Sequence, residues 1–415
     1  MEYKEYAAIA TIIRGLFINT AGYPWVVIHE RCERAEETVP ADALVVDISP
    51  SMQDGVLDEE AAAKIFQEAC TAWEFDKAPS GVEAAMKQEA AKKEPSCIVL
   101  KRDAENTIGA IEAFYWIDKD IDAARKRMYG KTASMLAGKV PQSHQLLTEP
   151  KLDAASRADV VQHKIALLVG DIRNSASIAR SLACSGALVF IADANLETAQ
   201  QLANDINTNL RRTAVIPVQV NHTDEASVEA LFNTIAETAG GLDICICAEN
   251  TLEQGNLLER SLEEFKTRNT TFFLIAKYAG LLFRRQFRTA PSWITDIIRI
   301  SEYFYSENQE GLGLTVSIAL ELIKYNIKVN TICPSNDFDH PFWTDPETGL
   351  FVQHLKAGKA PGTRSIAEVK AYYEARVPMK RSCTVLDVMR AVYYVIEQNY
   401  ETGQTLSVSG GKKVL

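Results

Sequence analysis

The sequence has no excess of basic residues and no long apolar run. Its 44 Lys and Arg residues are outnumbered by 55 Asp and Glu residues, which gives a formal net charge of −11. That balance argues against nucleic acid as a partner, because nucleic-acid-binding proteins carry basic excess on one face. The apolar stretch YAAIATIIRGLFI is interrupted by Arg14, is too short to cross a bilayer and lacks a signal cleavage pattern. We therefore expect neither a nucleic-acid nor a membrane partner.

The sequence also lacks the cysteine and histidine spacings of a metal site. Of its eight cysteines, only Cys245 and Cys247 alternate, within the run LDICICA, so both would point the same way on a strand. No CxxC pair and no Cys/His partner at zinc-site spacing accompanies them, which favours buried packing over metal binding. Scattered free thiols suit a reducing compartment. We expect a cytoplasmic protein without a metal.

Residues 1–140 show a mixed pattern of helices and strands. The periodicity predicts helices over 3–18, 59–73, 82–93 and 119–137, and strands over 25–30, 43–49, 97–103 and 108–117. Asp58 is placed to cap the second helix. No phosphate loop, nucleophile elbow or metal cluster is found in this part, so we expect a smaller mixed α/β domain of unassigned role. A polar, proline-containing linker follows at 141–163.

From residue 164 to 415, apolar strands alternate with helices. Continuous apolar runs such as KIALLVG and ALVFIAD are typical of strands buried on both faces of a parallel sheet. This predicts an α/β fold, a Rossmann-like doubly wound parallel sheet with strand order 3-2-1-4-5-6-7. Pro217 interrupts the third strand, and in that order the third strand is an edge, where proline is tolerated.

Four motifs in this second domain resemble the short-chain dehydrogenase/reductase superfamily. GGLDICI (240–246) resembles the family's approach to strand four, and ALELIKYNIKVNTICPS (319–335) its fifth helix and sixth strand. RVPMKRSCTVLDVMRAVYYVIEQ (376–398) and TGQTLSVSGG (402–411) resemble its arginine-valine-proline turn and closing strand. The resemblance implies the Rossmann-like fold and an NAD(P)-linked activity.

The resemblance also implies where a dinucleotide would bind. Gly170 matches the first glycine of the family's GxxxGxG turn, and Arg173, in GDIRNSASIA, is placed to face a phosphate. Asp193 matches the acid that binds the ribose hydroxyls and selects NAD over NADP. Asn221 stands where the family has an adenine-binding acid, although a helix-capping role is favoured for it. Pro334 is assigned to the cofactor side of strand six.

Other positions of that site depart from the family. The second and third glycines of the turn are replaced in RNSA, the turn is one residue short, and Asp171 puts a negative charge where phosphate would lie. After strand four the chain has CAEN, in which Glu249 replaces a small residue. These changes argue against the usual binding mode, so the cofactor is NAD(H) or no dinucleotide at all.

Four residues occupy the family's catalytic positions. Ser301 matches the substrate-orienting serine, Tyr305 the general acid/base, Gln309 the lysine position and Asn269 the supporting asparagine. A neutral glutamine does not lower a tyrosine pKa as lysine does. Tyr305 follows Ser301 more closely than in the family, and Tyr303 competes for its role. Asn269 equally suits a helix cap or kink.

These departures favour a pseudoenzyme with an assembly, regulatory or ligand-binding role. The alternative is an NAD(H)-linked oxidoreductase of a small carbonyl, polyol or sugar-phosphate substrate with an atypical active site. A third possibility is an aldolase-like domain that precedes the dehydrogenase domain. The chain resembles that arrangement only in domain order, because residues 1–160 lack the paired histidines that bind zinc in such aldolases.

Two helices are apolar well around their circumference, over 261–286 and 309–325. One buried face does not require this much apolar surface, which favours a homodimer or homotetramer formed through them. The alternative is burial of a helix between the sheet and the N-terminal domain.

Overall fold

The computed structural model describes most of the chain in two units. The described ranges are 3–21, 25–31, 43–53, 56–76, 97–101, 111–118 and 120–130 in the N-terminal unit, and 157–170, 172–248, 262–301, 309–339 and 341–411 in the C-terminal unit. The predicted helix over 82–93 and most of the predicted linker lie outside the described residues.

The N-terminal unit holds a four-stranded mixed sheet with two long helices. Its main elements are α1 (Tyr3–Ala21), β1 (Val26–Arg31), β2 (Ala43–Asp47), α2 (Glu59–Asp76), β5 (Cys97–Lys101), β6 (Ile111–Asp118) and α4 (Ile121–Gly130). The strand order is β1-β6-β5-β2, antiparallel except for the β2–β5 pair. Asp58 accepts hydrogen bonds from the backbone N–H groups of Glu60 and Ala61, which starts α2 as predicted.

The C-terminal unit is a seven-stranded parallel sheet in the order β13-β12-β11-β10-β7-β8-β9. Its strands are β7 (Ile165–Gly170), β8 (Leu188–Asp193), β9 (Val215–Gln219), β10 (Ile244–Ala248), β11 (Thr295–Ile300), β12 (Ile327–Pro334) and β13 (Thr405–Val408). The predicted order is confirmed. Pro217 of β9 lies opposite Ile191 of β8. Because β9 is the edge strand of this sheet, no further strand needs the N–H group that proline lacks.

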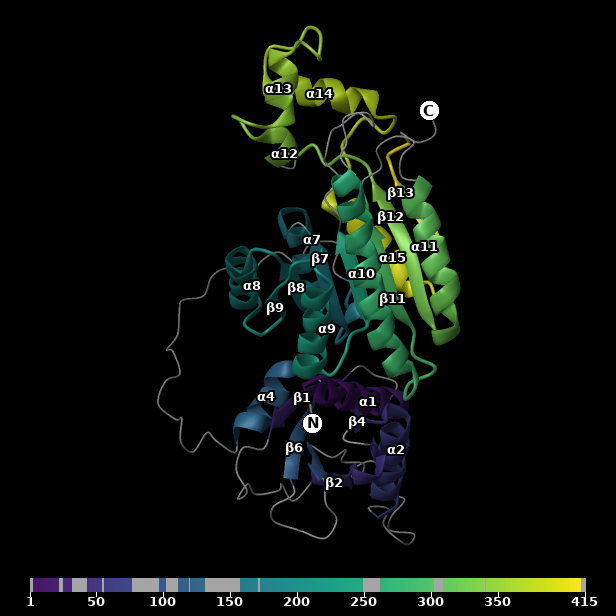
Figure 1. The fold of residues 1–415 in the computed structure, drawn as a ribbon. Helices are drawn as coiled ribbons and strands as arrows, with labels where there is room; N and C mark the ends of the chain where they lie inside the picture. The colour runs from purple at the N-terminus through teal and green to yellow at the C-terminus, as the bar shows by residue number, and fades with distance from the viewer. Residues whose placement is uncertain are drawn as a thin grey trace, which may run out of the picture.

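Helices cover both faces of this sheet (Figure 1). One face packs on α7 (Ile172–Cys184), α8 (Leu196–Leu210) and α15 (Val385–Glu397); the other packs on α9 (Glu225–Ala239), α10 (Leu262–Phe287) and α11 (Gln309–Leu322). Alternate residues along each strand serve the two faces: Leu168 of β7 faces the first set, and Leu167 faces the second.

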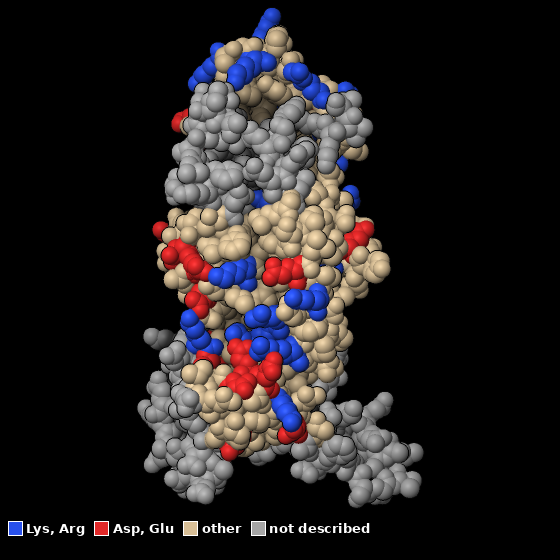
Figure 2. Space-filling view, turned by 45° about the vertical axis from the view of Figure 1, so that its right-hand side comes forward, with Lys and Arg blue, Asp and Glu red and all other residues tan. Residues whose placement is uncertain are grey.

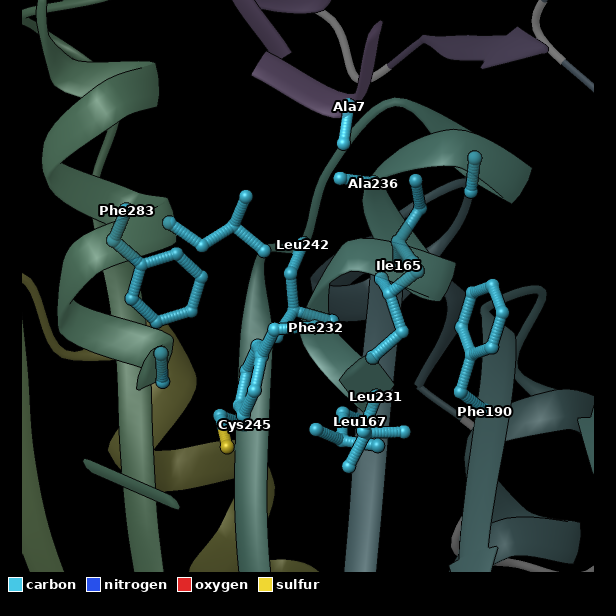
Figure 3. Packing of buried hydrophobic residues seen from close by; sticks show 14 of the residues in the cluster. Ala7, Ile165, Leu167, Phe190, Leu231, Phe232, Ala236, Leu242, Cys245 and Phe283 are labelled. Carbon is cyan, nitrogen blue, oxygen red and sulfur yellow. The ribbon is translucent and has the colours of Figure 1, made fainter. Parts of the chain in front are cut away.

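The two units share one hydrophobic core. The cluster beneath α9 and α10 continues into the N-terminal unit through Ala7 of α1, Val26 of β1 and Trp116 of β6. Ala7 lies against Ala236 and Leu242 of the C-terminal unit (Figure 3). Fully buried apolar surface on both sides of the junction means that the units stabilise each other.

Polar contacts join the units at the amino ends of the parallel strands. Arg14 and Asp243 form an ion pair in which both side chains are buried, and Arg14 also donates to the carbonyl of Trp25. At the edge of the junction, Glu59 of α2 pairs with Arg285 and Arg288 of α10. Figure 2 shows acidic and basic side chains gathered on the surface between the lower and the upper parts of the molecule.

Three short helices, missed in the sequence, follow β12 and lie at the top of the molecule in Figure 1. They are α12 (Pro341–Thr344), α13 (Leu350–Lys356) and α14 (Ile366–Arg376). An aromatic cluster of their own, with Phe338, Trp343 and Phe351 fully or almost fully buried, holds them together. Among the described ranges, no helix combines the length and the apolar character needed to cross a bilayer.

Candidate functional site at the carboxyl ends of the strands

The site residues predicted from the sequence lie at the ends of neighbouring parallel strands. Gly170, Asp193 and Pro334 are the last residues of β7, β8 and β12, and Ser301 follows β11 directly. Because carboxyl ends of parallel strands meet at one edge, these positions share the edge where open α/β sheets bind ligands. The N-terminal unit lies at the opposite edge, beside Asp243 and Gly240.

Gly170 lies in close contact with the neighbouring strand. It pairs with Ala248 of β10, and a Cβ atom added to it would lie 1.8 Å from the Ala248 carbonyl oxygen. Its φ of 131° is also a conformation that residues with a side chain rarely adopt. Glycine is therefore required here by the packing of the two strands, independently of any ligand.

The turn after Gly170 is short. Only residue 171 separates β7 from α7, so the amino end of α7 lies directly at the sheet edge. Ser175, in the first turns of α7, is buried, and its hydroxyl has no hydrogen-bond partner among the described residues. The side chains of Asp171 and Arg173, like Glu249 after β10, lie outside the described residues.

Asp193 stands at the end of β8, where the sequence placed it. One carboxylate oxygen accepts a hydrogen bond of 2.7 Å from the backbone N–H of Asn195, and Asn195 in turn caps α8. His222, after β9, is an electrostatic neighbour that the sequence reasoning missed. Burial lowers the pKa of His222, and the Asp193 charge opposes this shift. His222 directly follows Asn221, after β9, and β9 lies next to β8 in the sheet. That neighbourhood could have indicated from the sequence that His222 lies near Asp193.

Asn221 has a local structural role. Its side-chain oxygen accepts hydrogen bonds from the N–H and the hydroxyl of Thr223, and its own N–H donates to Ser227. These bonds shape the turn into α9, whose cap is Asp224. The cofactor role assigned to Asn221 stays a prediction.

Of the four catalytic positions, the structure describes the side chain of one. Ser301 is buried, and its backbone N–H donates to the carbonyl of Ile332, so it continues the sheet pairing. Asn269 and Gln309 lie in α10 and α11, but their side chains, and all of Tyr305, lie outside the described residues. Whether the four meet in one site stays a prediction.

A buried cation beside this end of β11 was also missed. Arg299, two residues before Ser301, is almost fully buried, and its guanidinium lies 4.8 Å from the ring centroid of Phe272 in α10. Such stacking suits the weakly hydrated guanidinium group. The sequence shows only that an arginine interrupts an otherwise apolar strand, and no periodic pattern indicates that it stacks on a ring of another helix.

A metal centre finds no support among the described residues, where no three His, Cys, Asp or Glu side chains are grouped to hold an ion. Cys245 and Cys247 are both fully buried in the shared core. Burial raises the pKa of the Cys245 thiol well above its usual range, so that residue stays protonated.

Comparisons with known proteins fit this architecture. A family described as enoyl-(acyl carrier protein) reductase matches residues 175–336. Sorbitol-6-phosphate 2-dehydrogenase of Escherichia coli is 25% identical over 266 residues, which are 60% of this chain and 98% of that protein. The crystal structure of sorbitol-6-phosphate 2-dehydrogenase from Erwinia amylovora superposes with a TM-score of 0.51 at 28% identity, covering 59% of this chain and 98% of that one.

The chain is a member of the short-chain dehydrogenase/reductase superfamily, and its C-terminal unit carries the resemblance. The match spans a complete relative, while two-fifths of this chain lies outside it, in keeping with the additional N-terminal unit. YuxG of Bacillus subtilis, named an uncharacterized oxidoreductase, is 30% identical over 196 residues, which are 44% of this chain and 28% of that protein. The short-chain dehydrogenase/reductase relatives are thus oxidoreductases by name, and their similarity favours the oxidoreductase alternative over the pseudoenzyme.

Proposed function

We propose that the protein is an NAD(H)-linked oxidoreductase acting on a small carbonyl, polyol or sugar-phosphate substrate. The observation that carries the proposal is the similarity, in both sequence and structure, to sorbitol-6-phosphate 2-dehydrogenases over nearly their whole length. The described part of the N-terminal unit packs at the amino ends of the strands, so it does not occupy the carboxyl ends where ligands bind in open α/β sheets.

The residues at the carboxyl edge suit a dinucleotide in two respects. Asp193 would bind the adenosine ribose hydroxyls, and its charge would disfavour the extra phosphate of NADP. The amino end of α7 would face the pyrophosphate, with the unpartnered Ser175 hydroxyl as a further donor. When bound, the nicotinamide supplies the hydride acceptor or donor.

In this proposal Ser301 orients the substrate oxygen, and Tyr305 transfers the proton. Gln309 in the lysine position is neutral, so it does not activate the tyrosine as a lysine would. Asn269 would support the site from α10.

The pseudoenzyme hypothesis rests on the replaced glycines, Glu249 and Gln309. The relatives favour the oxidoreductase, so the pseudoenzyme becomes the outcome against which the proposal is tested. Titration calorimetry with NADH and NADPH separates the two. We expect NADH to bind at micromolar affinity and more tightly than NADPH. Absence of binding by both would overturn the proposal.

A second measurement addresses the substrate class. Sorbitol 6-phosphate and unphosphorylated sorbitol, each with NAD, are suitable probes, and NADH formation is followed by absorbance. The Tyr305→Phe variant is the matched control, since it removes only the hydroxyl. Turnover that survives in Tyr305→Phe at the wild-type rate would remove Tyr305 from the mechanism.

We further propose that the protein assembles as a homodimer or homotetramer through α10 and α11. Large apolar side chains stand exposed on both helices: Phe273 and Leu281 on α10, and Val316 and Leu320 on α11. Ile323, just beyond α11, extends the same surface. Leu320 is 74% exposed, an unfavourable position for leucine unless a partner covers it.

A further inference from the structure

A cavity lies beside the edge strand β13, at the carboxyl ends of β12 and β13 and on the side of the sheet opposite β8 and β9. Its volume is about 470 Å³, and it is enclosed by the ends of β12 and β13, the turn over 377–383 and the start of α15. The sheet order places β13 at one edge and β8 and β9 at the other. A ligand here is therefore separate from Asp193 and from the adenosine side of the proposed dinucleotide site.

The cavity contains a buried hydroxyl that no described residue satisfies. Ser407 of β13 lines the cavity, and its side-chain oxygen is buried without a hydrogen-bond partner in the part of the chain that the structure describes. Buried polar atoms in proteins are nearly always paired, so an unpaired one at a cavity wall indicates a missing partner. Ser335, Ser382 and Ser409 bring further hydroxyl-bearing side chains to the same wall.

Arg381 provides the charge, and its orientation is fixed. Nη1 and Nη2 each donate to one carboxylate oxygen of Asp387, and Nη1 also donates to the carbonyl of Ser382. This uses the end of the guanidinium. The N–H of Nε and the second N–H of Nη2, which together form the side of the group, donate to no acceptor in the described part of the chain. Two parallel N–H donors are the geometry that binds a carboxylate or phosphate in bidentate fashion.

Two other titratable groups line the cavity. Asp387 is ionised and its charge is paired with that of Arg381, while its carboxylate also accepts from the N–H and the hydroxyl of Thr384. Burial, followed by the charge of Asp387, raises the pKa of Cys383 to about 12, which keeps this thiol neutral and unsuited to bind a metal.

The segment after β13 packs closely on the turn over 377–383. Gly410 and Gly411 adopt φ angles of 59° and 87°, and Cβ atoms added to them would lie 3.1 Å from Val377 and 3.0 Å from Pro378. The carbonyl of Gly410 accepts from the N–H of Met379, which ties the two segments together. Both segments contribute residues to the lining of the cavity.

We propose that this cavity is a binding site for a small oxyanion, a carboxylate or a phosphate group, held by the free side of the Arg381 guanidinium and by the Ser407 hydroxyl. The site does not depend on the proposed dehydrogenase activity. Its ligand is a small acid or the phosphate of a phosphorylated metabolite.

Titration calorimetry of the full chain tests the site, in a buffer free of phosphate and carboxylate at low ionic strength. The probes are inorganic phosphate and malonate, which distinguish the two anion chemistries. We expect one of them to bind the wild type and to bind Arg381→Lys at least tenfold more weakly, because lysine keeps the charge but loses the paired donors. Ser407→Ala is expected to weaken binding several-fold.

The control is Arg390→Gln, which removes an exposed arginine of α15 outside the cavity. Arg390→Gln should leave the affinity for the anion unchanged. If Arg381→Lys and Ser407→Ala also left that affinity unchanged, the proposal would be overturned. Failure of both anions to bind the wild type would overturn it as well. Thermal unfolding of each variant separates loss of binding from loss of fold, and Ser407→Ala removes no hydrogen bond to any residue that the structure describes.

Discussion

The guanidinium of Arg14 donates a 2.7 Å hydrogen bond to the carboxylate of Asp243, 229 residues further along the chain. Both side chains are buried, and the same carboxylate accepts from the backbone N–H of Ile165 and from the indole N–H of Trp293. One carboxylate therefore connects α1, the first strand of the parallel sheet and the segment before β11.

Replacing Arg14 with methionine leaves Asp243 as a buried carboxylate without its counter-charge. We expect Arg14→Met to lower the free energy of unfolding by about 3–5 kcal/mol, the usual cost of breaking a buried pair from one side. Urea denaturation followed by circular dichroism measures this. Arg180→Met, which breaks an exposed pair with Asp205, should cost less than about 1 kcal/mol. Equal losses for the two variants would contradict the interpretation.

A pair of glycine substitutions tests the close contact between β7 and β10. Gly170→Ala introduces a Cβ 1.8 Å from the Ala248 oxygen, at a φ of 131°, and we expect it to destabilise the protein by about 3 kcal/mol or more. Gly313, in α11, has open space around it and no positive φ. Gly313→Ala should stabilise by about 0.5–1 kcal/mol through better helix propensity. Differential scanning calorimetry would show midpoints moving in opposite directions; a stable Gly170→Ala would refute the required contact.

Asp387 predicts an acid-sensitive contribution to stability. Hydrogen bonding to Arg381 lowers the pKa of Asp387 to about 2, against the opposing effect of burial. Because the folded-state pKa is depressed, the contribution is complete above the ordinary carboxyl pKa near 4 and is lost as the pH falls to about 2. It amounts to about 2 kcal/mol. Chemical denaturation at pH 5 and pH 3 should show a smaller pH dependence in Asp387→Asn than in the wild type, while Asp205→Asn serves as the exposed control. Identical pH profiles would exclude Asp387 as the source.

The proposed oligomer depends on the exposed apolar surface of α11. Leu320→Glu places a charge at its most exposed leucine, and we expect sedimentation velocity to show monomers where the wild type forms dimers or tetramers. Tyr400→Glu makes the same kind of change at a fully exposed aromatic outside α10 and α11, and should not alter the assembly. A wild type that sediments as a monomer at micromolar concentration would refute the oligomer itself.

The parallel sheet was predictable because its strands are continuous apolar runs, and Pro217 even indicated which strand lies at the edge. The helices α12–α14 were not, because they are short and are held by an aromatic cluster rather than by a periodic apolar face. The ion pair of Arg14 has no local signature either: the sequence showed only that a charge interrupts an apolar stretch, and its partner lies on the other unit.

Gly170, Asp193 and Ser301, which the sequence predicted as site residues, lie at the carboxyl edge of the sheet, and their roles in a site stay predictions. The sequence reasoning missed His222 and Arg299, whose significance comes from neighbours on adjacent elements rather than from a motif. The combined action of Asn269, Tyr305 and Gln309 depends on side-chain positions beyond those described, and activity measurements on their variants decide it.

The hydrophobic core that both units share has a practical consequence for anyone who expresses the protein in pieces. A fragment beginning near residue 157 would expose the apolar side of α9 and the buried Asp243, and a fragment ending near residue 130 would expose Val26 and Trp116. Each piece alone would be prone to aggregation. Produced together in the same cell, the two pieces would each supply the surface that the other lacks and so reconstitute a single soluble particle.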